Sequence, residues 1–204
     1  SGQPFNNDLP SDPAYWQALP MEKVLEWQAQ GYPRKQAHSE FPFLLQNPQT
    51  NLEKAMAKIE QVLAKERDFW HVKSYQYNRA ILEVPENQVI EEIKARWQLP
   101  AVYLTFLERF SPASDAFLKG INLYGANTLI KHQCGYVFSS PDDELFPDWK
   151  AHWLVIADKD ADPYILDLSK SDGNDAPIYK APHGAGQWKW RKVAGSFLEF
   201  LEKL

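Results

Sequence analysis

The sequence has little cysteine, no long apolar run and no strong excess of charge of either sign. Cys134 is the only cysteine among 204 residues, so no disulfide can form within the chain and a zinc site built from cysteines is excluded. No stretch of about 18 apolar residues occurs, which predicts that no helix spans a membrane. The net charge of -5 combines 22 basic and 27 acidic side chains, which is not the basic surface that binds nucleic acid or anionic lipid. We therefore expect neither nucleic acid nor a membrane as a partner, and the low cysteine content is typical of a cytoplasmic protein.

Aromatic side chains are abundant, with eight Trp, nine Tyr and eleven Phe. Aromatic residues dominate hydrophobic cores, which makes packing the first interpretation. Trp and Tyr are also the usual anchors of protein interfaces, which makes an adhesive surface the second. A chain of 204 residues can bury a core of this kind without disulfides or metals.

Residues 1–80 are predicted to form an N-terminal extension that consists of a proline-rich arm and helices. Four prolines stand among Asn, Asp and Ser in residues 1–20, a composition that resists regular structure. A short helix is predicted at 21–30, where Gly31 can end it. Three prolines in residues 32–49 predict a loop after this helix.

The clearest element of the extension is a helix predicted from Asn51 to about residue 69. Thr50 and Glu53 have the spacing of a capping box, in which two side chains bind free amide groups of the first turn. A strand is predicted within 74–84, where apolar residues alternate loosely. The helix prediction rests on apolar residues that recur at helical spacing, namely Leu52, Met56, Ile59 and Leu63.

Two further helices are predicted on either side of Leu99 and Pro100. The first covers 86–98, starts at Pro85 and has one apolar face. The second covers 101–110, where apolar residues recur at spacings of three, four and seven. Because the residue before a proline is disfavoured in a helix, Leu99-Pro100 separates the two. After a turn-rich connection, short strands are predicted at 121–124, 127–131 and 136–138.

The C-terminal part predicts a hairpin of two buried strands followed by a helix. Residues 152–157 form an almost continuous apolar run, which is typical of a strand covered on both faces. Residues 164–168 alternate with the period of a partner strand, and the short acidic spacer between the two runs favours a hairpin. Ser196 and Glu199 have the spacing of a second capping box, and apolar residues after Ser196 predict a terminal helix.

The order of these elements carries a family resemblance. It rests on Leu99-Pro100 and on the segments 103–107 (YLTFL), 153–158 (WLVIAD), 164–168 (YILDL) and 193–201 (VAGSFLEFL). In this order and at this spacing, the segments resemble the SMI1/KNR4, or SUKH, superfamily over about residues 86–204. The resemblance implies an α+β fold for a domain at 81–204, in which a curved, mostly antiparallel sheet packs against helices.

The same resemblance implies a function in binding. Bacterial members of the superfamily are commonly immunity proteins that bind and neutralise a cognate toxin, often a nuclease, while other members are intracellular regulatory scaffolds. Neither role requires an active site, so the resemblance implies a non-enzymatic protein-binding module with no catalytic residue and no cofactor. A bacterial immunity protein is the leading hypothesis, and a regulatory or assembly scaffold is the alternative. An enzyme of unknown class is the third hypothesis, and it would require titratable groups that converge in a pocket.

Three alternating carboxylates, Asp158, Asp160 and Asp162, occupy the first, third and fifth places of a calcium-binding loop. The sixth place holds Pro163 instead of Gly, and the twelfth holds Ser169 instead of Glu. The chain therefore lacks both the sharp turn and the bidentate ligand of such a loop. A solvated hairpin turn is the better interpretation, and no metal site is predicted.

Two other patterns have a chemical and a structural interpretation. His132 and Cys134 stand two residues apart and would share one side of a strand, but an unpaired cysteine is usually a small buried apolar residue. No metal or nucleophile is predicted there. Segment 188–191 alternates Trp with Lys and Arg, a composition that can stack on nucleic acid. In an acidic chain, a strand with one packed face explains this alternation better.

Two acidic loops supply the predicted partner-binding residues. Charged turns are common on any protein surface, so an ordinary solvated surface is the first interpretation. The functional hypothesis is that the loops attract a basic protein partner, because complementary charge accelerates and orients association. A nuclease toxin would offer such a surface in its phosphate-binding cleft. The residues of this hypothesis are Asp142, Asp143, Glu144, Asp158, Asp160 and Asp162.

Overall fold

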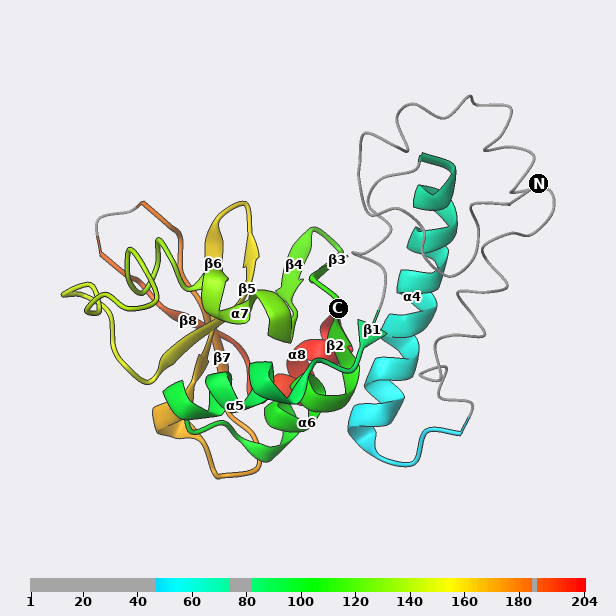
Figure 1. The fold of residues 1–204 in the computed structure, drawn as a ribbon, viewed down its shortest axis with the longest axis horizontal. Helices are drawn as coiled ribbons and strands as arrows, with labels where there is room; N and C mark the ends of the chain where they lie inside the picture. Colours follow the sequence, from blue (N-terminus) through cyan, green and yellow to red (C-terminus); the bar gives the residue numbers. More distant parts are fainter. Residues whose placement is uncertain (1–46, 74–81, 185–186) are drawn as a thin grey trace.

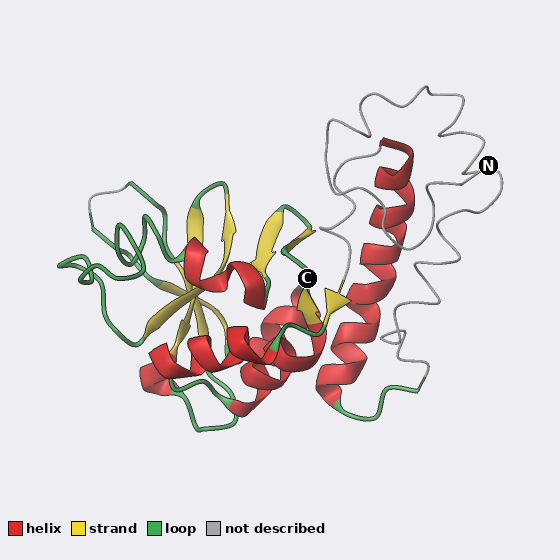
Figure 2. Ribbon diagram, viewed as in Figure 1, coloured by secondary structure: helices red, strands yellow, loops and turns green. Residues whose placement is uncertain are grey.

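The structure is a computed structural model that describes residues 47–73, 82–184 and 187–204. Within these ranges it contains five α-helices and a six-stranded antiparallel sheet that does not close into a barrel (Figures 1 and 2). The α+β fold predicted from the sequence is therefore confirmed, and a helical N-terminal segment is present. The arm and the short helix predicted within residues 1–30 lie outside the described residues.

The sheet is a meander in which each strand pairs antiparallel with the next one along the chain. Its strands are β3 (Asp115–Leu118), β4 (Ile121–Tyr124), β5 (Trp153–Lys159), β6 (Asp162–Asp167), β7 (Ile178–Lys180) and β8 (Arg191–Ala194). A separate two-stranded pair consists of β1 (Leu82–Glu83) and β2 (Ser111–Pro112). Because each strand of the meander neighbours the next, the connections leave the sheet at its ends, where loops can carry a binding site.

The helices are α4 (Asn51–Lys73), α5 (Asn87–Arg96), α6 (Ala101–Phe110), α7 (Ala126–His132) and α8 (Phe197–Lys203), and a short 3₁₀ helix, η2 (Leu168–Lys170), follows β6. Helix α6 has the predicted bounds. Helix α5 is shorter than predicted, because Trp97 is already extended, with φ -138° and ψ 138°. Pro85 precedes this helix instead of starting it, since Glu86 is the N-cap residue.

The predicted capping box is present at α4, whereas at α8 the Ser196 cap is present but Glu199 binds the amide of Gly195 instead of that of Ser196. Glu53 N donates to Thr50 Oγ1 at 3.1 Å, and Thr50 N donates to Glu53 Oε2 at 3.1 Å. At α8, Glu199 N donates to Ser196 Oγ at 3.0 Å, while Glu199 Oε2 accepts from Gly195 N at 2.6 Å. These bonds satisfy amide groups that have no partner within the first turn, so the start of each helix follows from its local sequence.

An aromatic core holds α6 and α8 on the sheet. Phe197 of α8 packs edge-on against Tyr103 and Phe106 of α6, with ring centroids 4.8 and 5.0 Å apart. Phe200, one turn further along α8, packs on Tyr164 of β6 at 5.4 Å. Helix α4 packs against α8 and α6 and contacts β3, so it lies at the β3 end of the sheet (Figure 1). The first interpretation of the aromatic residues, core packing, therefore holds for these five side chains.

Strands β5 and β6 form the predicted hairpin. The four residues 154–157 are each 0% exposed, as expected of a strand covered on both faces. Pairing continues to Lys159 and Asp162, so the turn contains only Asp160 and Ala161. Both turn residues have positive φ, 55° and 66°, which is the conformation of a two-residue turn whose twist matches the strands.

A bulge in β5 explains how α7 joins the sheet. The register shifts between Val155 and Ala157, so Ile156 is an extra residue in β5. Strand β4 pairs with β5 only from Ala157 onward, which leaves the same edge of Val155 without a strand. Gln133, 0% exposed and placed directly after α7, fills this position. Its Nε2 donates to Val155 O at 2.8 Å and its Oε1 accepts from Val155 N at 3.0 Å, so one side chain replaces a strand residue.

Two of the predicted strands are wrong. Residues 127–131 lie in helix α7, because a short apolar run does not distinguish a buried helix from a strand by its period. Residues 136–138 form turns, in which an isolated bridge joins Cys134 and Phe138. His132 therefore ends a helix while Cys134 lies in the turn after it, and the two do not share the side of a strand.

Candidate functional site

The connection between α7 and β5 carries the first group of predicted partner-binding residues. Both of its ends are buried, since Phe138 and Trp149 are each 4% exposed. Phe146 N donates to Val137 O at 2.8 Å, and this hydrogen bond brings the later part of the connection back beside its first residues. We name residues 139–148 the acidic loop. Figure 1 shows it as the yellow-green loop that extends furthest from α4.

Four tryptophans attach the end of the acidic loop to the sheet. Trp149 meets Trp153 of β5 edge-on at 5.7 Å, and its Nε1 donates to the Trp153 carbonyl at 3.0 Å. Trp149 also packs edge-on against Trp188 and Trp190, at 5.5 and 5.9 Å. Trp188 and Trp190 stack on each other at 5.3 Å, before β8 begins at Arg191, so the strand predicted at 188–191 is displaced. We name these four residues the tryptophan cluster, since their rings pack on one another.

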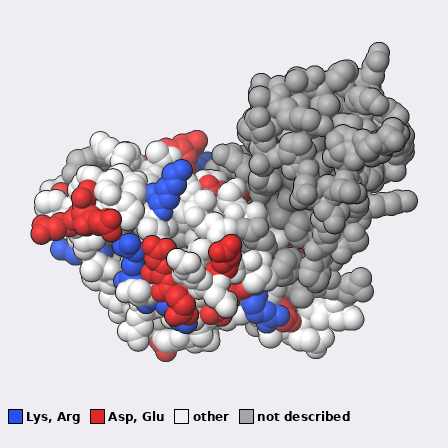
Figure 3. Space-filling view, viewed as in Figure 1, with Lys and Arg blue, Asp and Glu red and all other residues white. Residues whose placement is uncertain are grey.

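The acidic loop has a marked excess of negative charge. Its exposed carboxylates are Asp142, Asp143, Glu144 and Asp148. Figure 3 shows Asp and Glu side chains gathered at the end of the molecule where Figure 1 places this loop. Arg96 at the end of α5 partly compensates them, since its Nη1 donates to Pro141 O at 2.9 Å and its Nη2 lies 4.0 Å from Asp142 Oδ1. The outer side of the loop keeps its negative charge.

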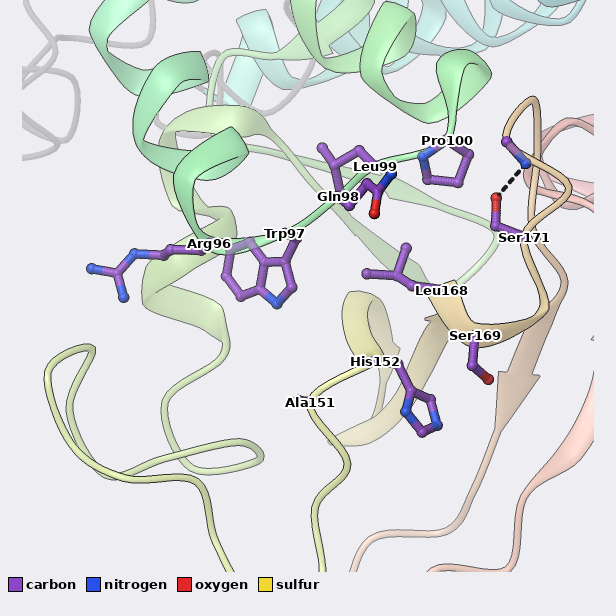
Figure 4. A pocket seen from close by; sticks show the side chains of 11 residues that line it. Arg96, Trp97, Gln98, Leu99, Pro100, Ala151, His152, Leu168, Ser169 and Ser171 are labelled. Atoms are coloured by element: carbon purple, nitrogen blue, oxygen red, sulfur yellow. Dashed lines mark hydrogen bonds between the residues drawn. The ribbon is translucent and has the colours of Figure 1, made fainter.

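One hollow adjoins the acidic loop and shares three lining residues with a larger hollow, and we name the two together the groove. The larger has a volume of about 520 Å³ and separates the segment that leaves α5 from the segments that enter β5 and leave β6 (Figure 4). Figure 4 shows Trp97 and Leu168 between these walls, with His152 on the wall opposite α5. The smaller hollow has a volume of about 230 Å³ and lies between α5 and the acidic loop. The residues that line both hollows are Arg96, Trp97 and Ala151.

Two large apolar side chains of the acidic loop are exposed. Leu145 is 42% exposed and lines the smaller hollow, and Phe146 is 37% exposed. Both follow Glu144 directly in the sequence. An apolar pair inside a charged, turn-rich segment was the signal for this surface, and the sequence prediction missed it because it used charge alone. Nothing in the sequence places Trp97 beside these residues.

The second group of predicted residues lies at the β5–β6 hairpin, which Figure 1 draws well apart from the acidic loop. Asp158 is partly buried, and its Oδ2 accepts from Tyr124 Oη at 2.8 Å. Burial raises the pKa of the Tyr124 hydroxyl, and the hydrogen bond and negative charge of Asp158 raise it further. Burial likewise raises the pKa of the neighbouring Tyr136 to about 12. Tyr124 therefore remains a hydrogen-bond donor, and Asp158 has a partner inside the fold.

The other two hairpin carboxylates differ in their surroundings. Asp162 Oδ1 accepts from His183 N at 2.9 Å, and its Oδ2 lies 3.2 Å from Lys180 Nζ. The hydrogen bond from His183 and then the Lys180 ammonium lower the pKa of Asp162. Asp160 is exposed in the turn. The three carboxylates do not converge, and the described part of the chain groups no three His, Cys, Asp or Glu side chains that could hold a metal ion.

A polar cluster that the sequence did not predict joins β3, β4 and α7. Asp115 is 7% exposed, and its Oδ1 accepts from Thr128 Oγ1 at 2.6 Å. Its Oδ2 lies 2.8 Å from His132 Nε2, and the His132 ring stacks on Tyr124 at 4.1 Å. Thr128 and His132 are 13 and 17 residues from Asp115, so no local motif marks the cluster.

The Asp115 carboxylate is expected to make stability depend on acid pH. Burial raises the pKa of Asp115, but hydrogen bonds from His132 and Thr128, together with the charge of His132, lower it more. The net pKa is lowered, so the ionised group stabilises the fold above its unfolded pKa of about 3.9, and this contribution is lost as pH falls through the folded value. We expect Asp115→Asn to be less stable than the wild type at neutral pH, and the difference to shrink below about pH 4. Urea unfolding across this pH range measures it.

The exposed Asp160 provides the control for this experiment. Asp160→Asn removes a carboxylate in the hairpin turn without touching the Asp115 cluster, so its effect on stability should be small. Stability curves that stay parallel for Asp115→Asn and the wild type would contradict a role for the Asp115 charge.

His152, Asp167 and Ser169 lie together beside the larger hollow but do not form a catalytic triad. Ser169 Oγ donates to Asp167 Oδ1 at 2.7 Å, and His152 Nε2 lies 3.9 Å from the same oxygen. In a triad the serine donates to the histidine, which then removes its proton. Asp167 is 3% exposed and also faces Lys170 Nζ at 3.1 Å. These contacts fix η2 to the end of β6 and supply no activated serine.

The helices in the described ranges include none with the length and apolar character needed to cross a membrane.

The fold and this surface define a class of protein, an α+β domain whose helices pack on an antiparallel meander and whose longest connection displays a charged loop. The model of the SMI1 / KNR4 family (SUKH-1) matches residues 85–203. The chain belongs to this family, which confirms the resemblance found over 86–204 in the sequence. Membership is consistent with a module that binds a protein partner. No curated protein matches the sequence of this chain.

Proposed function

We propose that this chain is an immunity protein, a non-enzymatic module that binds and neutralises a toxin. The observation that carries the proposal is the acidic loop, which displays adjacent carboxylates together with exposed Leu145 and Phe146 beside the groove. Protein interfaces combine a few apolar anchors with a polar rim in this way. Membership of the SMI1/KNR4 family supports a protein partner.

Neutralisation works by covering the working surface of the toxin. The carboxylates of Asp142, Asp143 and Glu144 attract and orient a basic surface, such as the phosphate-binding cleft of a nuclease. Leu145 and Phe146 then lose their contact with water against the partner, which stabilises the complex. Nucleic acid can no longer reach the covered cleft. No step of this mechanism requires a catalytic residue or a cofactor of the chain.

The proposal assigns binding to a domain at 81–204 and treats residues 1–80 as an extension of it. It places the protein in the cytoplasm, where a nuclease toxin would meet its substrate. The hairpin residues Asp158, Asp160 and Asp162 remain in the proposal as a second acidic surface. Asp160 is its exposed member.

Co-expression with the product of a neighbouring gene tests the proposed function. We expect that product to stop growth when it is expressed alone, and the chain to restore growth and to co-purify with it. A chain that protects against no neighbour, and instead purifies with a complex that cells need for growth, would favour the regulatory or assembly scaffold and contradict the immunity role.

Neutralising the acidic loop is expected to slow association with the toxin. At low salt, the combined change Asp142→Asn, Asp143→Asn and Glu144→Gln should lower the association rate constant by about tenfold, and added salt should shrink the difference. Stopped-flow fluorescence of the tryptophan cluster measures the rate. Asp160→Asn tests the hairpin surface separately. Glu202→Gln, an exposed position on α8, is the control, and a loop variant that associates as fast as this control would contradict steering by the loop.

A further inference from the structure

The smaller hollow of the groove has the size and lining of a pocket for one side chain. Its volume of about 230 Å³ is below the range of about 300–1,000 Å³ that is typical of sites for whole small molecules. Trp97, Val137, Phe138 and Leu145 give it a largely apolar lining. Val137 and Phe138 are 3% and 4% exposed, so this part of the lining is continuous with the packed core. An apolar side chain placed here would meet a preformed surface.

The rim of the same hollow is negative. Asp143 lines it, and the exposed residues Asp142 and Glu144 flank Asp143 in the sequence. Among the described residues, the positive group that lines it is Arg96, whose guanidinium donates to Pro141 O and lies 3.9 Å from Glu92 Oε1 and 4.0 Å from Asp142 Oδ1. Because Glu92 and Asp142 already balance the positive charge of Arg96, a basic residue of the partner would meet the remaining carboxylates of the acidic loop.

The groove continues beyond this hollow. Arg96, Trp97 and Ala151 line both hollows, so the larger hollow lies directly beside the smaller one. There Figure 4 shows Leu168 near the polar side chains of His152 and Ser169, with Leu99 on the opposite wall. A mixed lining of this kind suits the backbone and flanking side chains of an extended segment.

We propose that the groove binds an extended segment of the partner in which one apolar side chain, leucine or a residue of similar size, is flanked by arginine or lysine. The apolar side chain enters the hollow between Trp97 and Leu145. A flanking basic side chain pairs with Asp143. This inference rests on the proposed function, because it names the part of a basic protein partner that the acidic loop would recognise.

Short blocked peptides test the inference without the partner. The probe is acetyl-Arg-Leu-Arg-amide, added to the full chain while the backbone amide signals are followed by NMR. We expect saturable shifts at Trp97, Val137, Leu145 and Ala151. Acetyl-Arg-Ala-Arg-amide and acetyl-Glu-Leu-Glu-amide should each bind about tenfold more weakly, since each lacks one of the two recognised groups.

Filling the hollow provides the matched variant. Ala151 is exposed and lines both hollows, so Ala151→Leu occupies the groove without entering the core. It should weaken binding of acetyl-Arg-Leu-Arg-amide by about tenfold. Ala95→Leu, at an exposed position of α5 that lines neither hollow, should leave binding unchanged. The inference is wrong if the three peptides bind equally, if the shifts lie outside the groove, or if Ala151→Leu binds like Ala95→Leu.

The outcome is distinguishable from that of the proposed function. A chain that protects cells from a toxin but does not bind the peptide in its groove would retain the proposed function and refute this inference. A groove that binds the peptide selectively in a chain that protects against no toxin would support this inference and refute the immunity role.

Discussion

The Gly125→Ala variant is expected to lose about 3 kcal/mol or more of its free energy of unfolding. An added Cβ would lie 2.1 Å from the carbonyl oxygen of Pro112 and 2.2 Å from that of Ser114. Both are backbone atoms, so no side-chain rotation can relieve the clash. Gly125 N also donates to Ser114 O at 2.8 Å, and α7 begins at the next residue. A shift of this backbone would therefore disturb β3 and α7 together. Urea unfolding of the two proteins measures the loss.

Gly135→Ala is the matched control for this variant. Gly135 has a φ of 87°, and an added Cβ would meet no atom within 4 Å. Its cost is that of the left-handed conformation alone, about 1–2 kcal/mol. Gly125 has a φ of -84°, which other residues adopt readily, so its cost is steric. A smaller loss at Gly125 than at Gly135 would show that the contact with Pro112 and Ser114 relaxes easily.

The Trp149→Ala variant is expected to lose about 3–5 kcal/mol, as is usual when a large buried aromatic side chain is truncated. Trp149 is 4% exposed and lies at the centre of the tryptophan cluster, in edge-on contact with Trp153, Trp188 and Trp190. Its truncation leaves a cavity and removes the hydrogen bond to the Trp153 carbonyl. Urea unfolding gives the loss of stability. Near-ultraviolet circular dichroism reports the loss of ordered tryptophan contacts.

Two variants separate the packing of Trp149 from its position in the connection to β5. Trp149→Phe keeps an aromatic ring but not the indole donor, so it should lose less than Trp149→Ala. Phe146→Ala, in the acidic loop, truncates a ring that is already 37% exposed and should cost about 1 kcal/mol or less. Equal stabilities of Trp149→Ala and Phe146→Ala would contradict the role of the tryptophan cluster in fixing the loop to the sheet.

If the tryptophan cluster holds the acidic loop in place, loss of Trp149 should also weaken partner binding in molecules that remain folded. The reason is that a loosened loop must be ordered again when the complex forms, and that entropy opposes binding. This effect would appear in affinity at neutral pH. The charge-neutral variants of the loop act on the association rate instead.

Four of the five described helices and the hairpin could be predicted because the signals for them are local. Thr50 with Glu53 and Ser196 with Glu199 are separated by three residues, so a capping box can be recognised without knowing the rest of the fold. The apolar run at 154–157 is visible in the sequence without knowledge of its neighbours, and its length predicts a central strand. The structure buries all four residues. The order of these elements was sufficient to recognise the family.

The error at 127–131 has a tertiary cause. Helix α7 has only seven residues, too few for the period of its apolar side chains to identify it. It is fixed by contacts at both ends, since Gly125 approaches Ser114 before it and Gln133 binds the free edge of β5 after it. Gln133 lies 22 residues from Val155 in sequence, and its backbone-like role depends on the bulge in β5. A glutamine in a turn carries no sign of that role.

The candidate binding surface was predictable only in part. The carboxylates of the acidic loop were found from composition, whereas the groove beside them was not. Its walls meet where Arg96 binds Pro141, 45 residues further along the chain, and this approach exists only after α5 and the connection to β5 have packed.

The cap that Asp175 supplies to α8 could not be predicted for the same reason. Its carboxylate accepts from the first amide groups of α8 at 2.8 and 3.2 Å, and these amides lie 22 and 23 residues further along the chain.

The sequence alone determines the class of fold, the family, four of the five described helices, strands β4, β5 and β6, and the negative charge of two loops. These properties depend on the spacing of apolar residues and on contacts between residues three or four apart. Only the tertiary structure decided that α7 is a helix, that Asp158 and Asp162 have partners inside the fold, and that the acidic loop borders a largely apolar hollow. Those properties depend on which distant segments pack together, and many sequences with the same local pattern could pack different side chains there.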